Sequence, residues 1–391
     1  MIPSISTIEL LQLASGDRLS LQVYKFIGAN PGKKAYLQSN LHGAEIVGNA
    51  VIHQLIEFLI GLNATDLVGE IWLVPVCNPF STNQRTHYFS TGRFNIYDGK
   101  DWNRIFWDYE KECEDLAEFA QSQLDVDADK IRKNYLEKIK SAFENQLEKI
   151  NAPSGVLLSD RYRYHLQSLC LDADYVIDIH SSSNQAIDYI YGFRGREESS
   201  KAFLLDYEIL LNKYDGDAFD EAFLKPWLAL EDNLANLGKS IQFDLESWTL
   251  ELGSGMEMNP DSVKKGVRGI KNYLSQKGIL SIPDFPLPET VYHPINFILK
   301  TQIKKYYSPA GGMIQSRVKL GTKVKTGERL YQLLCFNKEE RLPTLIDIKA
   351  EKAGLIFDVS TNHSVNQSEY VLTVVEDESE LTQASQSVVG A

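Results

Sequence analysis

Two side chains that can bind a metal ion, His42 and Glu45, lie three positions apart in the stretch SNLHGAEIVGNA. The preceding residues KKAYLQSN have the pattern of a short strand, and the residues that follow place Ile46, Ile52 and Leu55 at helical spacing. Open α/β sheets bind ligands where a strand gives way to the next element. The pair is therefore a candidate for a metal site, although an isolated H-x-x-E is also typical of a solvated turn.

A second histidine, His180, ends the apolar strand candidate YVIDIH and is followed by three serines. This position faces the edge where an open α/β sheet binds its ligands. Two histidines and one glutamate are a common ligand set for catalytic Zn²⁺, which activates water near neutral pH. We therefore predict one zinc site per chain, formed by His42, Glu45 and His180. Asp178, two residues before His180, is suited either to orient an imidazole or to cap a neighbouring loop.

A carboxylate stands among apolar residues in the strand candidate SWTLELGSG, where it is Glu251. A charge in such a place either pairs with another group or takes part in chemistry. Hydrolysis by an activated water needs a proton acceptor, and we predict that Glu251 is this general base. The glycines that follow allow a substrate to approach the backbone closely. Glu246 is the competing carboxylate, and a solvated strand end is the alternative for Glu251.

Three arginines, Arg85, Arg93 and Arg104, lie in a loop-like stretch that is rich in glycine and asparagine. A guanidinium group can bind a carboxylate through two parallel hydrogen bonds. Most surface arginines are simply solvated, so these three gain significance only together with the predicted metal site.

The composition is that of a folded protein whose charge does not suit nucleic acid. The 391 residues are 43% hydrophobic and 24% charged, and the formal net charge is −13, which provides no basic field. The four cysteines are far apart, as is typical of reduced thiols. We find no signal-peptide pattern and no run of about 18 apolar residues. We therefore expect a cytoplasmic protein without a membrane span. The sequence leaves open whether it forms a homo-oligomer.

The elements that must position these residues form an α/β domain followed by a smaller β domain. Strand-like and helix-like segments alternate over residues 1–290, which predicts a mixed, twisted sheet flanked by helices. Residues 108–165 predict a helical insertion, because apolar residues recur there three or four positions apart between charges. Short strands and turns over residues 291–376 predict a C-terminal β domain. Residues 377–391 are too polar to pack, and we expect a flexible tail.

Six short motifs occur in order along the chain. They are His42-Gly43-Ala44-Glu45, Asn78-Pro79, Arg93-Phe94, Asp101-Trp102-Asn103-Arg104, Asp178-Ile179-His180 and Thr249-Leu250-Glu251-Leu252-Gly253. In type and order they resemble the succinylglutamate desuccinylase/aspartoacylase family of the zinc carboxypeptidase superfamily. The resemblance spans most of the chain outside the insertion and the tail, and it implies a zinc carboxypeptidase-like fold followed by a β domain. Ala44 and Trp102 depart from the residues that are more usual in the family, asparagine and leucine.

The resemblance also implies roles for the arginines, and it keeps the roles given above for the three ligands and the general base. Arg93 would polarise the scissile carbonyl and stabilise the oxyanion. Arg85 is a rival for this role, because an extra stretch, THYFSTG, precedes Arg93. Asn103 and Arg104 would hold the α-carboxylate of the substrate. No tyrosine of the β domain can be matched to a substrate contact, and the pair at 306–307 are candidates only.

The predicted function is a zinc-dependent hydrolase that cleaves the amide bond of an N-acyl amino acid. The substrate would be a small anionic N-acyl amino acid or a peptide. A metallocarboxypeptidase that acts on small peptides would share every site residue and differ in the size of its cleft. A zinc-binding protein without turnover is a third hypothesis. The presence of both Glu251 and Arg93 argues against it, because zinc binding requires neither.

Overall fold

A mixed β-sheet forms the centre of the computed structural model, which describes residues 1–87, 90–211 and 217–377. Within these residues the sheet has the strand order β1 (Ser4–Gln12), β2 (Arg18–Ile27), β4 (Val68–Val74), β3 (Asn30–Ser39), β5 (Tyr175–Ser182), β9 (Glu246–Ser254), β7 (Tyr189–Phe193), β8 (Tyr207–Leu211) and β10 (Asn296–Leu299). The strands β4, β3, β5 and β9 form a parallel block, which β2 and β7 join in antiparallel pairing. The predicted mixed sheet flanked by helices is confirmed.

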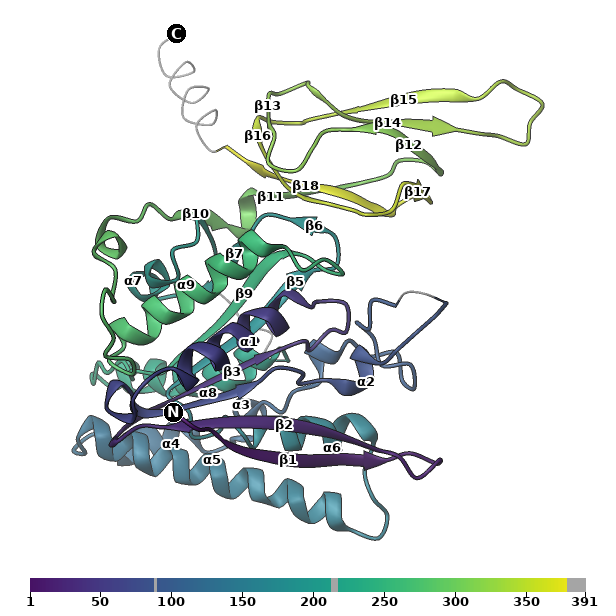
Figure 1. Ribbon diagram of the computed structural model, residues 1–391. Coiled ribbons are helices and arrows are strands. Elements are labelled where there is room, and N and C mark those ends of the chain that lie inside the picture. Colours follow the sequence, from purple (N-terminus) through teal and green to yellow (C-terminus); the bar gives the residue numbers. More distant parts are fainter. Residues whose placement is uncertain (88–89, 212–216, 378–391) are drawn as a thin grey trace.

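Helices cover both faces of the parallel block, which explains why its strands are continuously apolar rather than alternating. On one face, α1 (Val47–Ile60) and α9 (Pro260–Gln276) lie side by side (Figure 1). They share an apolar core with β3, β5 and β9. On the other face, α6 (Leu158–Gln167) and the start of α8 (Phe219–Asn236) pack over β3 and β5. Full burial of an aliphatic side chain contributes about 1.5–3 kcal/mol to the free energy of unfolding. The helices packed on both faces therefore hold the ends of the strands in place.

The region of the predicted insertion is helical in the structure. It contains α3 (Tyr109–Glu112), α4 (Leu116–Ser122), α5 (Ala128–Asn151) and α6. The helix α5 begins after Asp127, whose side chain accepts a hydrogen bond from Lys130 N at 2.9 Å and so caps a free backbone donor. Its apolar face, with Ile131 and Phe143 among its buried residues, packs against α8, whereas Leu147 on the same face is 39% exposed.

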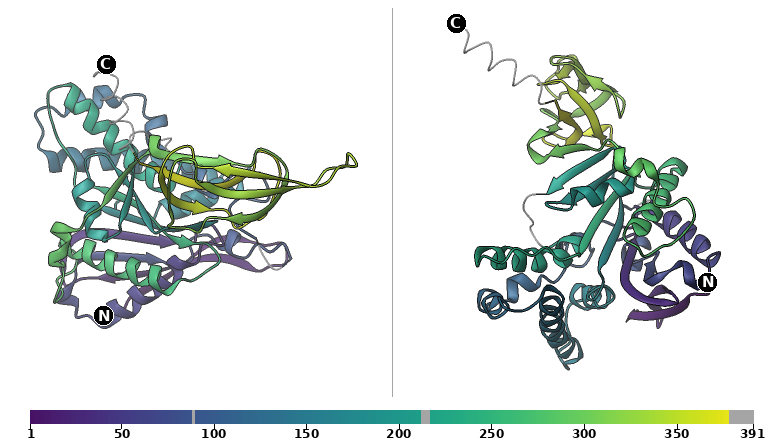
Figure 2. Two further views of the ribbon diagram at one scale, coloured as in Figure 1. Left: turned by 90° about the horizontal axis from the view of Figure 1, so that it is seen from above. Right: turned by 90° about the vertical axis from the view of Figure 1, so that its left-hand side faces the viewer.

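A smaller unit of two sheets follows the large sheet. Its strands are β11 (Ile303–Tyr307), β12 (Gly312–Arg317), β13 (Lys323–Val324), β14 (Arg329–Cys335), β15 (Thr344–Lys349), β16 (Gly354–Val359), β17 (Ser364–Val365) and β18 (Tyr370–Glu376). The short strand β6 (Gln185–Ala186), which follows β5, pairs with β16 and ties the two units together. This β unit and the helices α4 and α5 lie at opposite ends of the molecule (Figure 2).

The boundary between the two units lies later than residue 290. Strand β10 pairs with β8 in the large sheet over Asn296–Leu299, so we propose a domain boundary near residue 300. The predicted flexible tail lies, except for Asp377, outside the described residues.

Short elements complete the description. They are α2 (Pro79–Thr82), α7 (Glu197–Ser200) and the 3₁₀ helices Ala64–Asp66, Trp102–Arg104, Lys201–Phe203, Pro288–Tyr292 and Lys300–Gln302. Among the described residues, no helix combines the length and apolar character that crossing a bilayer requires.

Candidate metal centre and substrate pocket

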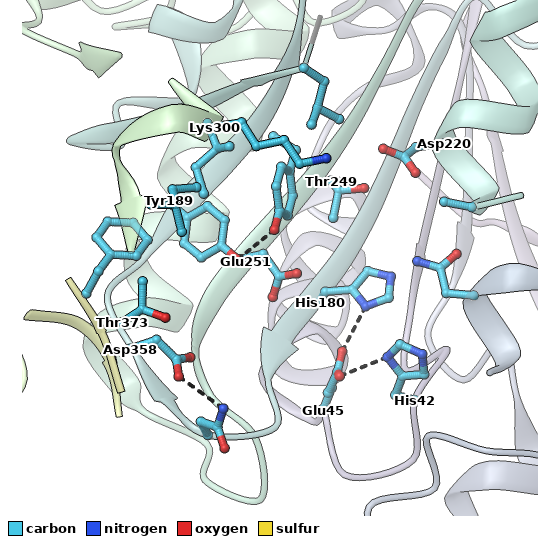
Figure 3. A pocket seen from close by; sticks show the side chains of 18 of the residues that line it. His42, Glu45, His180, Tyr189, Asp220, Thr249, Glu251, Lys300, Asp358 and Thr373 are labelled. Carbon is cyan, nitrogen blue, oxygen red and sulfur yellow. Dashed lines mark hydrogen bonds and ion pairs between the residues drawn. The ribbon is translucent and has the colours of Figure 1, made fainter. Parts of the chain in front are cut away.

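The predicted ligands lie where the parallel strands β3, β5 and β9 end. His42 and Glu45 follow β3, and His180 lies near the end of β5, directly beside Glu251 of β9 in the strand register. Because these strands are adjacent and parallel, residues far apart in the sequence meet at one edge (Figure 3). Gly43 allows the turn between His42 and Glu45 to pack tightly, since a Cβ there would lie 2.2 Å from Ser81 O.

Three donor groups converge at this edge. His42 Nδ1 lies 2.9 Å from Glu45 Oε1, and His180 Nδ1 lies 2.8 Å from Glu45 Oε2. One ligand atom from each of the three residues lies within 4.8 Å of the others, and all three side chains are buried. Two imidazole nitrogens and one carboxylate are a donor set that suits Zn²⁺ with a position left open. The chemistry of these residues therefore fits the predicted metal.

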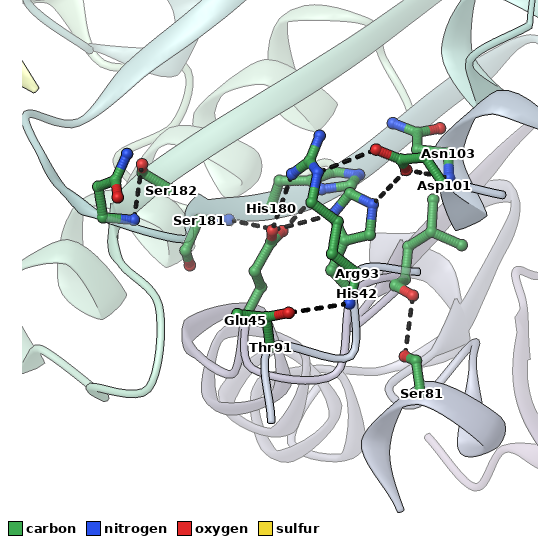
Figure 4. Close-up of polar contacts among 12 residues, drawn as sticks. His42, Glu45, Ser81, Thr91, Arg93, Asp101, Asn103, His180, Ser181 and Ser182 are labelled. Carbon is green, nitrogen blue, oxygen red and sulfur yellow. Dashed lines mark hydrogen bonds and ion pairs between the residues drawn. The ribbon is translucent and has the colours of Figure 1, made fainter. Parts of the chain in front are cut away.

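Each histidine contacts a second carboxylate through its other ring nitrogen. His180 Nε2 lies 2.9 Å from Asp178 Oδ2. His42 Nε2 lies 3.0 Å from Asp101 Oδ1, as Figure 4 shows. A carboxylate in this place orients the ring and fixes the tautomer, so that Nδ1 can face a metal ion. The sequence suggested this contact as one alternative for Asp178, but Asp101 was not predicted. Its position in the Asp-Trp-Asn-Arg motif gave no signal of contact with a histidine.

Opposite charges dominate the electrostatics of the centre. Burial opposes ionisation of Glu45, but the two imidazoles outweigh it and hold the pKa of this carboxyl well below its usual range. Burial likewise opposes protonation of His180, but Asp178 and Glu45 raise its pKa well above the ordinary value. The carboxylates and imidazoles of the centre thus stabilise each other's charged forms.

Glu251 differs from the other carboxylates of the centre. Burial raises its pKa to about 7, and its Oε2 atom is buried without a hydrogen-bond partner. A carboxylate with a pKa near neutrality can both accept and return a proton. The competing residue, Glu246, has a structural environment, because its carboxylate accepts hydrogen bonds from Tyr273 and Ser199 at 2.7 Å each.

The structure places Arg93 at the centre and Arg85 away from it. The Arg93 side chain lines the pocket, with Nε 2.9 Å from Asp101 Oδ2 and Nη1 3.9 Å from Glu45 Oε1. Burial opposes ionisation of Asp101, but the hydrogen bond and charge of His42, followed by the charge of Arg93, outweigh it and lower the pKa of Asp101 to about 2. Arg85 is exposed and donates from Nη1 to the backbone oxygens of residues 82 and 84, so it is not brought into the pocket.

Asn103 and Arg104 also line the pocket. Asn103 N donates to Asp101 Oδ1 at 2.8 Å, and Asn103 Oδ1 accepts from Phe219 N at 2.9 Å. Arg104 Nη1 donates to Asn103 O at 2.6 Å, and both side chains line the pocket. The 3₁₀ turn Trp102–Arg104 is therefore anchored on both sides before any ligand binds.

The pocket has a volume of about 850 Å³ and is lined by both structural units. The small β unit supplies six of its residues, Ile303, Lys305, Phe357, Asp358, Tyr370 and Thr373. Asp358 connects the units, because it accepts hydrogen bonds from Ser182 at 2.7 Å, from the Asn184 side chain at 3.0 Å and from Tyr370 at 2.5 Å.

Sequence reasoning missed most of this wall. The tyrosines that line the pocket are Tyr189, Tyr191 and Tyr370, whereas the candidate Tyr306 is buried elsewhere and accepts a hydrogen bond from Glu351 N. The pattern of one chain carries no signal that pairs the strand at Gln185–Ala186 with the one near residue 358.

Comparison with known proteins gives a consistent result. The model of the succinylglutamate desuccinylase/aspartoacylase catalytic domain matches residues 31–276. A search of curated proteins found no match. Among solved structures, a protein of this family from Shewanella amazonensis is 28% identical with a TM-score of 0.82, covering 95% of this chain and 98% of that chain.

Two further solved structures are similar in fold. A protein of the same family from Shewanella frigidimarina is 24% identical with a TM-score of 0.84, covering 96% of this chain and 97% of that chain. An ectoine utilization protein from Ruegeria pomeroyi is 17% identical with a TM-score of 0.64, covering 96% of each chain. The likeness thus includes the small β unit as well as the large sheet.

Proposed function

Because the chain belongs to the succinylglutamate desuccinylase/aspartoacylase family, we propose that it is a zinc-dependent hydrolase that removes the acyl group from an N-acyl amino acid. One observation carries this proposal: His42, Glu45 and His180 converge, buried, at a pocket that Glu251 and Arg93 also line. A site that only stored a metal ion would require neither a carboxylate with a pKa near neutrality nor a guanidinium group.

The metal would be held by the three converging residues. His42 and His180 would bind it through Nδ1, because Asp101 and Asp178 contact their other ring nitrogens, and Glu45 would bind it through its carboxylate. When bound, zinc in such a site supplies a Lewis acid that polarises a carbonyl and makes water nucleophilic near neutral pH.

Glu251 and Arg93 would carry out the chemistry that belongs to the chain itself. Glu251 accepts a proton from the attacking water and delivers it to the amide nitrogen, so that the amine departs neutral. Its pKa of about 7 suits both transfers. Arg93 faces the same space and stabilises the negative charge that develops on the carbonyl oxygen. Stabilisation of this charge is usually the largest single contribution to catalysis in such reactions.

Asn103 and Arg104 would hold the free α-carboxylate of the substrate. An arginine binds a carboxylate through two hydrogen bonds, and the Asn103 side chain is oriented by its bond to Phe219 N. Fixing this remote group places the scissile bond against the reacting groups. The walls contributed by the β unit favour a small N-acyl amino acid over the C-terminus of a long peptide.

The experiment is a comparison of wild type, Glu251→Gln and the control Glu118→Gln, which removes a charge from the exposed face of α4. We expect zinc to bind all three, and Glu251→Gln to lose at least 100-fold in kcat, as general acid–base catalysis contributes about 10²–10⁴-fold. N-succinyl, N-acetyl and dipeptide substrates are assayed side by side.

The outcomes separate the three hypotheses. Faster turnover of N-acyl amino acids than of dipeptides supports the deacylase, and the reverse order supports a carboxypeptidase. Bound zinc without turnover of any substrate would favour a binding protein. Unchanged activity in Glu251→Gln would remove the role given to that residue.

A further inference from the structure

Asp220, in the first turn of α8, is a buried carboxylate that points into the pocket (Figure 3). Asp220 is only 4% exposed. No lysine or arginine in the part of the chain that the structure describes forms an ion pair with it. Among the other acidic groups of the pocket, Glu45 contacts two imidazoles and Asp358 accepts three hydrogen bonds from side chains, whereas the buried Glu251 is the proposed general base.

Burying a carboxylate without a cation costs several kcal/mol, so such a group either stays protonated or receives a partner. Burial raises the pKa of Asp220, and the nearby Thr249 hydroxyl and His180 offset this only in part. An acidic residue in the first turn of a helix is stabilised by the helix dipole. Stabilisation by the helix dipole requires neither burial of the carboxylate nor its orientation into the pocket, because an exposed side chain in the first turn would be stabilised equally well.

An internal partner is the main alternative. Lys300 lines the same pocket and lies on the same side as Asp220 and Thr249 (Figure 3). Asp220 forms no ion pair with Lys300 or with Lys305, the other lysine that lines the pocket. Both lysines are exposed, so their charges are largely screened by water. A cation brought by a ligand is therefore the partner that best fits the buried carboxylate.

The position of Asp220 indicates which part of a substrate it would contact. The residue before it, Phe219, donates its backbone N–H to Asn103 Oδ1 at 2.9 Å. Asn103 and Arg104 are the proposed site of the α-carboxylate. The side chain of an amino acid branches from the carbon that bears this carboxylate, so Asp220 would lie beside the amino-acid side chain.

We propose that Asp220 selects N-acyl amino acids whose side chain ends in a cationic ammonium or guanidinium group. This inference rests on the proposed deacylase function and refines its substrate class. The cation would form an ion pair with the Asp220 carboxylate inside the pocket, with the Thr249 hydroxyl as a further acceptor. A neutral side chain of equal length would leave the carboxylate unpaired, and an anionic one would be repelled.

The test uses three substrates that carry the acyl group preferred in the assays above. They are the N-acyl derivatives of L-ornithine, of L-norleucine, which has a neutral side chain of the same length, and of L-glutamate. For wild type we expect kcat/KM for the ornithine derivative to exceed that for the norleucine derivative at least tenfold. For Asp220→Asn we expect this ratio to fall below about threefold, with turnover of the norleucine derivative retained. Asp232→Asn, which removes an exposed charge from the same helix, should keep the wild-type ratio.

Binding of the free amino acids provides a readout that needs no turnover. By calorimetry, L-ornithine should bind wild type at least tenfold more tightly than L-norleucine does, and Asp220→Asn should lose this difference. The comparison within wild type stands even where the variant does not fold.

The failures can be distinguished. Faster hydrolysis of the norleucine or glutamate derivative by wild type overturns the inference and leaves the deacylase function intact. No hydrolysis of any derivative by the zinc-loaded protein overturns the function, and the role of Asp220 is then decided by the binding of L-ornithine alone. Equal binding of L-ornithine and L-norleucine to wild type overturns the role proposed for Asp220.

Discussion

Substitution of Asp101 tests how the site holds its reacting groups, because this one carboxylate contacts three of them. Its Oδ1 lies 3.0 Å from His42 Nε2 and accepts a hydrogen bond from Asn103 N at 2.8 Å. Its Oδ2 lies 2.9 Å from Arg93 Nε. The three contacts belong to a proposed metal ligand, a proposed substrate-binding residue and the proposed oxyanion-binding residue.

The expected magnitude for Asp101→Asn follows from this geometry. The amide oxygen can replace Oδ1 and keep the contacts with His42 and Asn103, whereas the amide NH₂ would face the Arg93 N–H, donor against donor. One charge-assisted contact is therefore lost, which is worth about 1.5–3 kcal/mol. The Arg93 side chain is 37% exposed, so the lower end of this range applies. We expect kcat/KM to fall about tenfold, mainly through kcat, since about 1.4 kcal/mol corresponds to a factor of ten.

The assay measures zinc content, kcat and KM for wild type, Asp101→Asn and Asp101→Ala. The alanine variant loses all three contacts, and we expect its zinc affinity to fall about 10–100-fold, as is usual when a carboxylate behind a metal-binding histidine is removed. The asparagine variant should retain zinc. Wild-type kcat in Asp101→Asn, or zinc loss equal to that of Asp101→Ala, would refute the reasoning.

Three further predictions follow from individual residues. We expect kcat/KM of Arg85→Ala to stay within about threefold of wild type and that of Arg93→Ala to fall at least about 100-fold, both measured on the preferred substrate. Burial raises the pKa of Glu208 from 4.5 to about 7, so the folded state binds this proton more tightly than the unfolded state and wild type should lose roughly 3 kcal/mol of stability as pH rises between those values. Glu208→Gln should therefore melt above wild type at about pH 8 and not at about pH 4.5 by scanning calorimetry. For Asp358→Ala, which removes the acceptor of three side-chain hydrogen bonds, we expect faster amide hydrogen exchange in residues 182–186 and a raised KM.

The convergence of the three proposed metal ligands could be predicted from the sequence because its signals are local. His42 and Glu45 follow a strand, and a helix begins just after them. His180 lies near the end of a strand that is buried on both faces. Parallel neighbouring strands bring such ends together without further information. The glycines that follow Glu251 favoured it over Glu246, and the structure gives Glu246 a network of hydrogen bonds of its own.

The remaining pocket could not be predicted, because it depends on contacts between segments that no local pattern relates. Asp101 reaches His42 across 59 positions, and Asp358 reaches Ser182 across 176. Asp220 is the clearest case, because a charged residue in the first turn of an amphipathic helix predicts a solvated face. Only the packing of α8 against the Trp102–Arg104 turn, through Phe219 N and Asn103 Oδ1, makes it part of the pocket.

The connection between β5 and β6 joins the strand that carries a proposed metal ligand to the β unit that forms part of the pocket wall. Strand β5 carries His180, and only a few residues later β6 pairs with β16 of the β unit. Ser182 and Asn184, which lie between them, donate to Asp358. A displacement of the β unit would therefore pull on the segment that ends at a proposed metal ligand. Asp178, however, holds the other side of the His180 ring from within the buried part of β5. The pocket wall can thus vary through the β unit while the sheet holds His180 in place, which would allow substrate preference to change without loss of the proposed metal site.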